Sequence, residues 1–171
     1  NGHSQLAALI VRAVDLDIRP GDLLVVSFGH NDANRAKAER YVPADAFGES
    51  LRPFWDAARS HGAVCIFASP VAMREFDEAG VCHPSFAAYR EAMRAFAAEV
   101  GAPFIDLGAA TAAANTALGA ERCKARYMWV GAKQDNAHQQ NAGACRTAQA
   151  FVQQLLQDTT PALDVLRANF K

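Results

Sequence analysis

The sequence has no excess of either charge and no long apolar run. Its 17 Lys and Arg residues are balanced by 18 Asp and Glu residues, for a net charge of −1. Proteins that bind nucleic acids or anionic membranes need a basic surface, so this balance argues against both partners. No segment reaches the roughly 18 apolar residues of a membrane span, and no charged and then apolar signal segment opens the chain.

Cysteine is scarce, and its spacing is not that of a metal site. The four cysteines, Cys65, Cys82, Cys123 and Cys145, form no C-x-x-C motif, which argues against a zinc ribbon. Cys65 and Cys145 lie in apolar or helical stretches and are expected to be buried thiols. Cys82 and Cys123 lie in polar stretches and could pair if the protein is exported.

The 171 residues, of which 51% are hydrophobic, are enough for a single domain with one core. Apolar runs at 23–28, 63–68 and 104–107 predict three strands, each followed by a helix or a polar loop. Helices are expected at Leu6–Val14, Ala44–Arg59, Pro84–Val100 and Asn141–Leu156, and 109–120 is expected to be a surface helix or an irregular segment. This alternation predicts an α/β domain with a mostly parallel sheet, in which ligands bind at the carboxyl ends of the strands.

Two polar segments carry the residue types of acyl-transfer chemistry. Gly29-His30-Asn31-Asp32 follows the first predicted strand, and Asp135-Asn136-Ala137-His138 is expected in a loop that directly precedes the last helix. A carboxylate three residues before a histidine can orient the imidazole while it acts as general base. An amide such as Asn31 can donate to a developing oxyanion, which is typically worth about 10²–10³ in rate. Each segment also has an ordinary structural alternative, a helix cap for Asp135 and a polar turn for the other segment.

The chain resembles the SGNH (GDSL-like) serine hydrolases, and within them the rhamnogalacturonan acetylesterase group. The resemblance extends from Asn1 to about Leu156. It rests on these motifs: Pro20-Gly21-Asp22 before a strand that ends Phe28-Gly29-His30-Asn31-Asp32, Ser69-Pro70-Val71, Arg74-Glu75-Phe76-Asp77, Phe104-Ile105-Asp106-Leu107, and Asp135-Asn136-Ala137-His138 followed by Asn141-Ala142-Gly143-Ala144. It implies a three-layer, flavodoxin-like α/β/α fold.

The resemblance also implies roles for particular residues. Asp135 and His138 become the acid and base of a Ser-His-Asp triad, and Asn31 becomes the side-chain donor of the oxyanion hole. Gly2, at the end of a second family block, is expected to contribute a backbone N–H to the same hole. The implied substrate is an acetylated saccharide of pectic or another polysaccharide, with no cofactor and no metal, and the implied location is secreted or periplasmic. Candidate sugar contacts are His30, Arg74 and Trp129, with Arg35, Tyr127 and Lys133 as further candidates.

The chain departs from the family pattern at the nucleophile. In the family this serine stands in a Gly-Asp-Ser motif after the first strand, and neither the strand nor the motif is found here. Gly21-Asp22-Leu23 lacks the hydroxyl, Gly48-Glu49-Ser50 falls in a predicted helix, and Ser4 and Ser69 match other family positions. The family's first strand lies inside the sheet, so we expect residues 1–171 to be an N-terminally incomplete domain. A second polypeptide, or an N-terminal part removed or left out upstream of Asn1, would supply the strand and the serine.

Three alternatives remain at the level of sequence. The chain could be a catalytically inactive relative that binds carbohydrate or serves as a scaffold, which the lack of a Gly-Asp-Ser motif favours. It could be a lipase or thioesterase of the same superfamily. A metal hydrolase that uses His30, Asp32, Asp135 and His138 is a third possibility, although the usual spacings of metal phosphoesterases are lacking.

Overall fold

The computed structural model describes residues 11–13, 15 and 17–169, which form two compact units. The first, here called the sheet unit, comprises the chain up to Ser69, Phe86–Ile105 and the segment from Asp158 onward. The second, here called the hairpin unit, comprises Pro70–Ser85 and Asp106–Gln157. The expectation of one incomplete domain over residues 1–171 stays a prediction.

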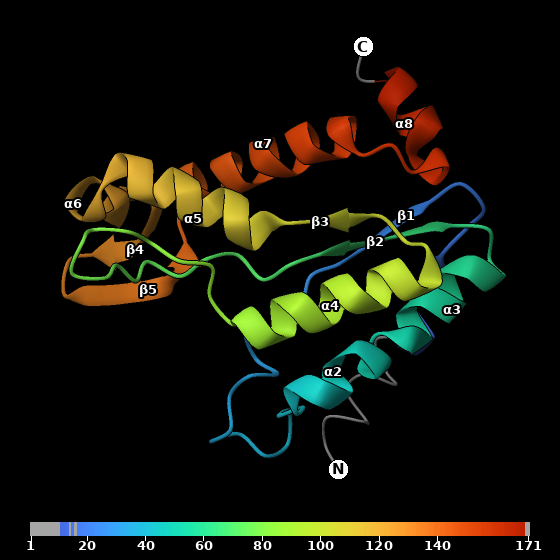
Figure 1. The fold of residues 1–171 in the computed structure, drawn as a ribbon, viewed down its shortest axis with the longest axis horizontal. Coiled ribbons are helices and arrows are strands. Elements are labelled where there is room, and N and C mark those ends of the chain that lie inside the picture. Colours follow the sequence, from blue (N-terminus) through green and yellow to red (C-terminus); the bar gives the residue numbers. More distant parts are fainter. Residues whose placement is uncertain (1–10, 14, 16, 170–171) are drawn as a thin grey trace. The chain divides into compact units, whose positions relative to one another are not determined.

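The sheet unit is built on three parallel strands in the order β1-β2-β3 (Figure 1). They are β1 (Leu23–Val26), β2 (Val64–Ala68) and β3 (Phe104–Ile105). In β2 the residues from Cys65 to Ala68 are at most 1% exposed, so both faces of the central strand are covered. Such two-sided burial is typical of parallel sheets with helices on both faces. The predicted α/β class with a mostly parallel sheet is confirmed.

Strand β1 lies at an edge of this sheet and, among the described residues, pairs only with β2. A turn sets its start, because the N–H of Asp22 donates to the carbonyl of Arg19 at 3.0 Å and Gly21 has a φ of 87°. Glycine adopts that positive φ without strain. Along the strand Leu23 is 41% and Val25 is 46% exposed. Since alternate residues point to the same face, one face of β1 remains uncovered within the described part of the chain.

The predicted helix Ala44–Arg59 is two helices, α2 (Ala44–Ser50) and α3 (Arg52–Ser60). The break at Leu51 follows from Pro53, which occupies one of the first positions of α3. Proline has no N–H to donate to the preceding turn and is tolerated only near the start of a helix.

Helix α4 (Ala87–Val100) begins three residues later than the predicted start at Pro84. Phe86 is in the left-handed region with a φ of 56°, which ends the extended loop before the helix. Of the predicted helix Leu6–Val14, residues 11–13 are described and are helical, and the other residues lie outside the described part. The sheet unit ends with η2 (Pro161–Leu163) and α8 (Asp164–Asn169).

The core of the sheet unit joins these helices to one face of the sheet. Its buried aromatic residues pack edge to face, with ring centroids 5.5 Å apart for Phe67 and Phe96 and 5.1 Å apart for Phe47 and Tyr89. Full burial of such a side chain is worth about 1.5–3 kcal/mol. The hydroxyl of Tyr89 also donates to the carbonyl of Asp32, which ties this core to the turn after β1.

The hairpin unit contains two long helices, an antiparallel hairpin and the loop 70–85 (Figure 1). Its elements are α5 (Leu107–Leu118), α6 (Ala120–Cys123), η1 (Lys124–Arg126), β4 (Tyr127–Val130), β5 (Lys133–Gln139) and α7 (Asn141–Gln157). The predicted strand 104–107 is two residues too long, because Asp106 caps α5 by accepting from the N–H of Ala109 at 3.1 Å. Helix α5 confirms the helical alternative for 109–120, and its buried residues show that it is more than a surface helix.

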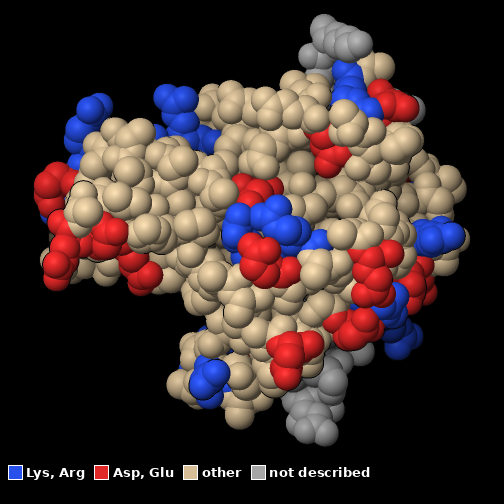
Figure 2. Space-filling model, viewed as in Figure 1, with Lys and Arg blue, Asp and Glu red and all other residues tan. Residues whose placement is uncertain are grey.

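Acidic and basic side chains are interspersed on the face seen in Figure 2, in line with their near-equal numbers. None of the described helices combines the length and the apolarity needed to cross a bilayer.

Candidate active site

The hairpin β4–β5 carries Asp135 and His138. Val130 pairs with Lys133, so the turn between the strands is the two-residue loop Gly131-Ala132, in which Gly131 has a φ of 58°. Two-residue hairpin loops require positive φ, and glycine provides it. The prediction that Asp135–His138 is a loop is therefore wrong, because these residues belong to strand β5. The prediction that they lead into the last helix is confirmed, since α7 begins at Asn141.

Asp135 and His138 form a hydrogen-bonded pair. The Nδ1 atom of His138 lies 2.8 Å from Oδ2 of Asp135. The backbone N–H groups of Ala137 and His138 both donate to Oδ1 of Asp135 at 2.9 Å. The Asp135 side chain is 19% exposed and that of His138 is 79% exposed. The carboxylate thus fixes the imidazole through Nδ1 and leaves Nε2 as the nitrogen that can take a proton from a nucleophile.

The same contacts set the charge of Asp135. Hydrogen bonds from the backbone N–H groups of His138 and Ala137, followed by the bond from the His138 side chain, hold the pKa of the Asp135 carboxyl well below its usual range. Lys133 adds a cation, with its Nζ atom 3.6 Å from Oδ2 of Asp135. Asp135 is therefore an anion at neutral pH, as a residue that stabilises an imidazolium must be.

Arg74 and Trp129, two of the candidate sugar contacts, are held together inside the hairpin unit. The Arg74 guanidinium carbon lies 4.6 Å from the centroid of the Trp129 ring. Both side chains donate to Oδ1 of Asn136, Arg74 from Nη1 at 3.2 Å and Trp129 from Nε1 at 2.9 Å. Asn136 lies between Asp135 and His138 in the strand, so this cluster adjoins the Asp–His pair. The sequence motifs did not single out Asn136 for this part.

Tyr127, a further candidate sugar contact, is fully buried. Its hydroxyl donates to the carbonyl of Ala72 at 2.6 Å and accepts from Nδ2 of Asn115 at 2.8 Å. Burial leaves Tyr127 no surface for a sugar. Tyr127 joins β4 to the loop 70–85 and to α5. Its position in the sequence did not suggest this structural role.

Asn31 lies in a tight turn at the carboxyl end of β1, in the sheet unit. The buried carboxylate of Asp32 accepts from the N–H of Gly29 at 2.9 Å, and the N–H of Ala33 donates to the carbonyl of Gly29 at 3.0 Å. The carbonyl of Asp32 in turn accepts from the buried hydroxyl of Tyr89 at 3.3 Å. Asn31 itself is exposed, so the turn presents its amide at the surface.

His30 packs inward from this turn. Its ring centroid lies 4.8 Å from that of Phe86, at an interplanar angle of 67°. Phe86 is the one residue other than glycine with a positive φ among the described residues. Such a conformation costs of order 1–3 kcal/mol, and the packing of the two rings offsets part of it.

The structure places two of the three serines that were compared with the family motif. Ser50 is the last residue of α2, and its Oγ donates to the carbonyl of Phe47 at 2.7 Å within that helix. Ser69 is fully buried, and its N–H donates to the carbonyl of Ile105 at 2.9 Å. Gly2 and Ser4 lie outside the described residues. Of the predicted site residues, the structure brings together Asp135 with His138 and Arg74 with Trp129.

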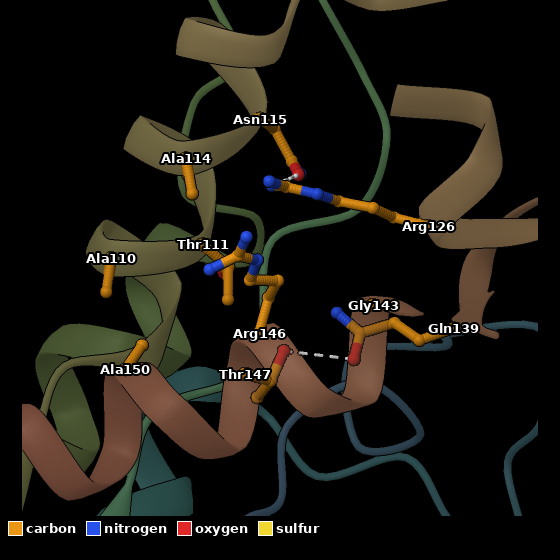
Figure 3. A pocket seen from close by; sticks show the side chains of 10 residues that line it. All are labelled: Ala110, Thr111, Ala114, Asn115, Arg126, Gln139, Gly143, Arg146, Thr147 and Ala150. Carbon is orange, nitrogen blue, oxygen red and sulfur yellow. Dashed lines mark hydrogen bonds between the residues drawn. The ribbon is translucent and has the colours of Figure 1, made fainter. Parts of the chain in front are cut away.

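A small cavity lies elsewhere in the hairpin unit, between α5 and α7 (Figure 3). Side chains of Arg126 and Arg146 reach it together with Asn115, Thr111 and Thr147. Its volume of about 20 Å³ has room for one water molecule but not for a sugar. Neither Asp135 nor His138 lines it. The His138 ring is thus exposed at the surface, outside this cavity.

Among the described residues, the structure offers no ligand set for a metal. Within the part of the chain that is described, no three His, Cys, Asp or Glu side chains gather closely enough to hold an ion. The proposed set is divided between the two units, with His30 and Asp32 in the sheet unit and Asp135 and His138 in the hairpin unit.

Comparison with known proteins decides the family. The model of the GDSL-like lipase/acylhydrolase family matches residues 3–143. The chain belongs to this family. Its predicted class, a carboxylic ester hydrolase, is the class of the acetylesterases that it resembles.

Two curated relatives come from Bacillus subtilis (strain 168). Rhamnogalacturonan acetylesterase RhgT is 32% identical over 165 residues, which are 91% of this chain and 70% of RhgT. The probable rhamnogalacturonan acetylesterase YesY is 35% identical over 128 residues, which are 74% of this chain and 58% of YesY. The predicted resemblance to the rhamnogalacturonan acetylesterase group is confirmed.

A crystal structure supports the same assignment. The YxiM protein of Bacillus subtilis superposes with a TM-score of 0.76 at 29% identity, over 86% of this chain and 40% of that one. The predicted SGNH-type α/β fold is confirmed by this similarity. The chain therefore corresponds to part of the length of each of these three proteins.

Proposed function

We propose that this chain carries the acid–base part of a serine esterase that removes acetyl groups from a pectic or related polysaccharide. The observation that carries the proposal is the Asp135–His138 pair, with Nδ1 of His138 2.8 Å from the carboxylate. The names of RhgT and YesY support an acetylated rhamnogalacturonan as the substrate.

In the proposed reaction, a serine hydroxyl attacks the acetyl carbonyl while Nε2 of His138 takes its proton. Asp135 stabilises the imidazolium, and the Asn31 amide and the Gly2 N–H stabilise the oxyanion. The sugar hydroxyl leaves with the proton from His138. Water then attacks the acetyl-serine with the same histidine as base, which releases acetate and restores the serine.

The serine of this mechanism comes from a Gly-Asp-Ser segment on another strand, outside residues 1–171. Among the described residues, β1 pairs on one side only, and this open edge supports a further strand at this position. The strand belongs either to the same polypeptide or to a second one. Intact mass spectrometry of the purified native protein distinguishes the two sources.

A polymeric substrate supports a secreted or periplasmic location, since polysaccharides of this size do not enter the cytoplasm. Fractionation of the source cells tests this, and recovery only with cytoplasmic markers would contradict it.

The proposal is tested by labelling the native protein with a fluorophosphonate and by measuring acetate release from acetylated rhamnogalacturonan. We expect one serine to be labelled, labelling to be lost in His138→Ala, and kcat to fall about 10²–10³-fold in Asn31→Ala. A native, folded protein that is neither labelled nor active would instead favour the inactive carbohydrate-binding alternative. A series of acyl chain lengths on one alcohol addresses the lipase alternative, because an acetylesterase loses kcat/KM as the acyl chain grows.

A further inference from the structure

Arg74 makes several contacts within the hairpin unit. It forms no ion pair among the described residues, although its charge helps to lower the pKa of Glu121. Its Nε and Nη2 atoms donate to the carbonyl of Ala120 at 3.1 and 2.8 Å. Its Nη1 atom donates to Oδ1 of Asn136, and its guanidinium lies over the Trp129 ring and, at 5.9 Å, near that of Phe76. The planar guanidinium suits this combination of forked donation and stacking, which an ammonium group cannot reproduce.

The main chain of Arg74 reaches the same partner. Its N–H donates to the carbonyl of Asn136 at 2.7 Å, so one arginine contacts both the backbone and the side chain of Asn136. Trp129 also binds Asn136, through a hydrogen bond from its indole N–H. The segment between Asp135 and Ala137 is therefore fixed from the side of the loop 70–85.

This arrangement bears on the Asp–His pair because of the neighbours of Asn136. The preceding residue is the carboxylate, and the two following residues supply the N–H groups that bind that carboxylate at 2.9 Å. A shift of the Asn136 peptide would change both bonds and, with them, the direction of the His138 ring. In an active site, a misplacement of about 1 Å can cost about 10²-fold in rate.

We infer that Arg74 is a positioning residue for the Asp135–His138 pair, which acts by clamping Asn136. This inference deepens the proposed esterase function and rests on it. It replaces the role of sugar contact for Arg74, since three of its N–H groups are directed at protein acceptors. Arg74 acts through Asn136, because its hydrogen bonds go to Ala120 and Asn136 and none goes to Asp135.

The test compares variants of the full-length esterase on a small acetyl ester. We expect kcat to fall about 10–100-fold, with little change in KM, in each of the variants Arg74→Ala, Arg74→Lys and Asn136→Ala. Because both residues act through one contact, the double variant Arg74→Ala/Asn136→Ala should be no less active than the more impaired single variant. Arg122→Ala is the matched control, because Arg122 is an exposed arginine on the neighbouring α6 whose side chain makes no hydrogen bond or ion pair among the described residues. A rise in KM at constant kcat would overturn the inference in favour of a substrate contact. Normal kcat per folded molecule with a lowered Tm would overturn it in favour of a purely structural role.

A second readout does not depend on activity. In Arg74→Ala and Arg74→Lys, hydrogen exchange of the Ala137 and His138 amides is expected to accelerate at least about tenfold relative to Arg122→Ala, because their bonds to Asp135 are loosened. Unchanged exchange would overturn the inference whatever the activity. If the native protein is inactive on acetyl esters while this exchange accelerates, the esterase proposal fails and the clamp on the pair stands.

Discussion

The carboxylate of Asp135 binds both the ring and the main chain of His138, at 2.8 Å from Nδ1 and at 2.9 Å from the backbone N–H. One residue thus determines the position of the histidine and the orientation of its imidazole. The pair needs no other segment to supply its hydrogen bonds, while Arg74 and Trp129 hold the strand segment that bears it.

Asp135→Asn should abolish most of the activity of the native esterase with little change in fold. The amide keeps the shape of the side chain but favours the wrong tautomer of His138, for which a loss of about 10⁴ in kcat is the expected scale. Asp77→Asn is the control, because Asp77 forms a similar pair with His83 at 2.8 Å in the same unit. This substitution is expected to leave kcat unchanged. Equal effects of the two substitutions would contradict the assignment of Asp135.

The stability that Asp135 contributes should depend on pH in a defined direction. Its pKa is lowered in the folded state by the bonds from His138 and Ala137, so the contribution is fully present above the unfolded value, about 3.9, and is lost as the pH falls through the folded value. Urea unfolding of the wild type and of Asp135→Asn should therefore show a difference in free energy that shrinks as the pH falls below about 4. A difference that stays constant down to the acid limit of folding would show that the carboxylate is not held as described.

Gly143→Ala should destabilise the hairpin unit. A Cβ atom at Gly143 would lie 2.2 Å from the carbonyl oxygen of Arg126 and 3.1 Å from Cβ of Gln139, and the backbone has to move to relieve this clash. We expect a loss of about 1–3 kcal/mol or more in the free energy of unfolding, although alanine is the better helix former. Ala148→Gly, at an exposed position of the same helix, is the control. It should lower the free energy of unfolding by only about 1 kcal/mol, which is the difference in helix propensity between alanine and glycine without any clash. An unchanged midpoint for Gly143→Ala in denaturant unfolding would contradict this close packing.

The four free cysteines should differ sharply in reactivity. Cys145 is exposed, so its prediction as a buried thiol is wrong, whereas Cys65, Cys82 and Cys123 are buried. Burial raises the pKa of the Cys65 thiol to about 12 and raises that of Cys123 as well. With an aromatic disulfide reagent we expect one thiol to react rapidly in the native protein and the other three only on unfolding. Rapid labelling that persists in Cys145→Ser would contradict the burial of the other three.

The strands of the sheet could be predicted to within two residues, because runs such as 23–26 and 64–68 are uniformly apolar. The break between α2 and α3 also had a signal, Pro53, which outweighs the helical spacing of the aromatic residues around it. Strand β5 had no such signal in its own composition, since Lys133–Gln139 is polar except for Ala137 and is fixed by pairing with β4. The one available sign was Gly131 between the two segments.

The part of the candidate site that depends on residues close together in the sequence could be predicted. Asp135 and His138 are three residues apart, so their pairing depends on local geometry that a motif can express. The contact between Arg74 and Asn136 joins residues 62 positions apart, and Tyr127 reaches Ala72 across 55 positions. Such contacts depend on the packing of the whole unit, so the spacing of residues in the sequence does not predict them.

The two-residue turn at Gly131-Ala132 has a consequence for how the site forms. Short hairpins close in about 1–10 μs, much faster than parallel strands that are joined by long crossovers. The Asp135–His138 pair lies within one such hairpin and spans only four residues, so its assembly adds almost nothing to the contact order of the chain. After dilution from denaturant, the orientation of His138 is therefore expected to recover with the hairpin, ahead of the pairing of β1 with β2.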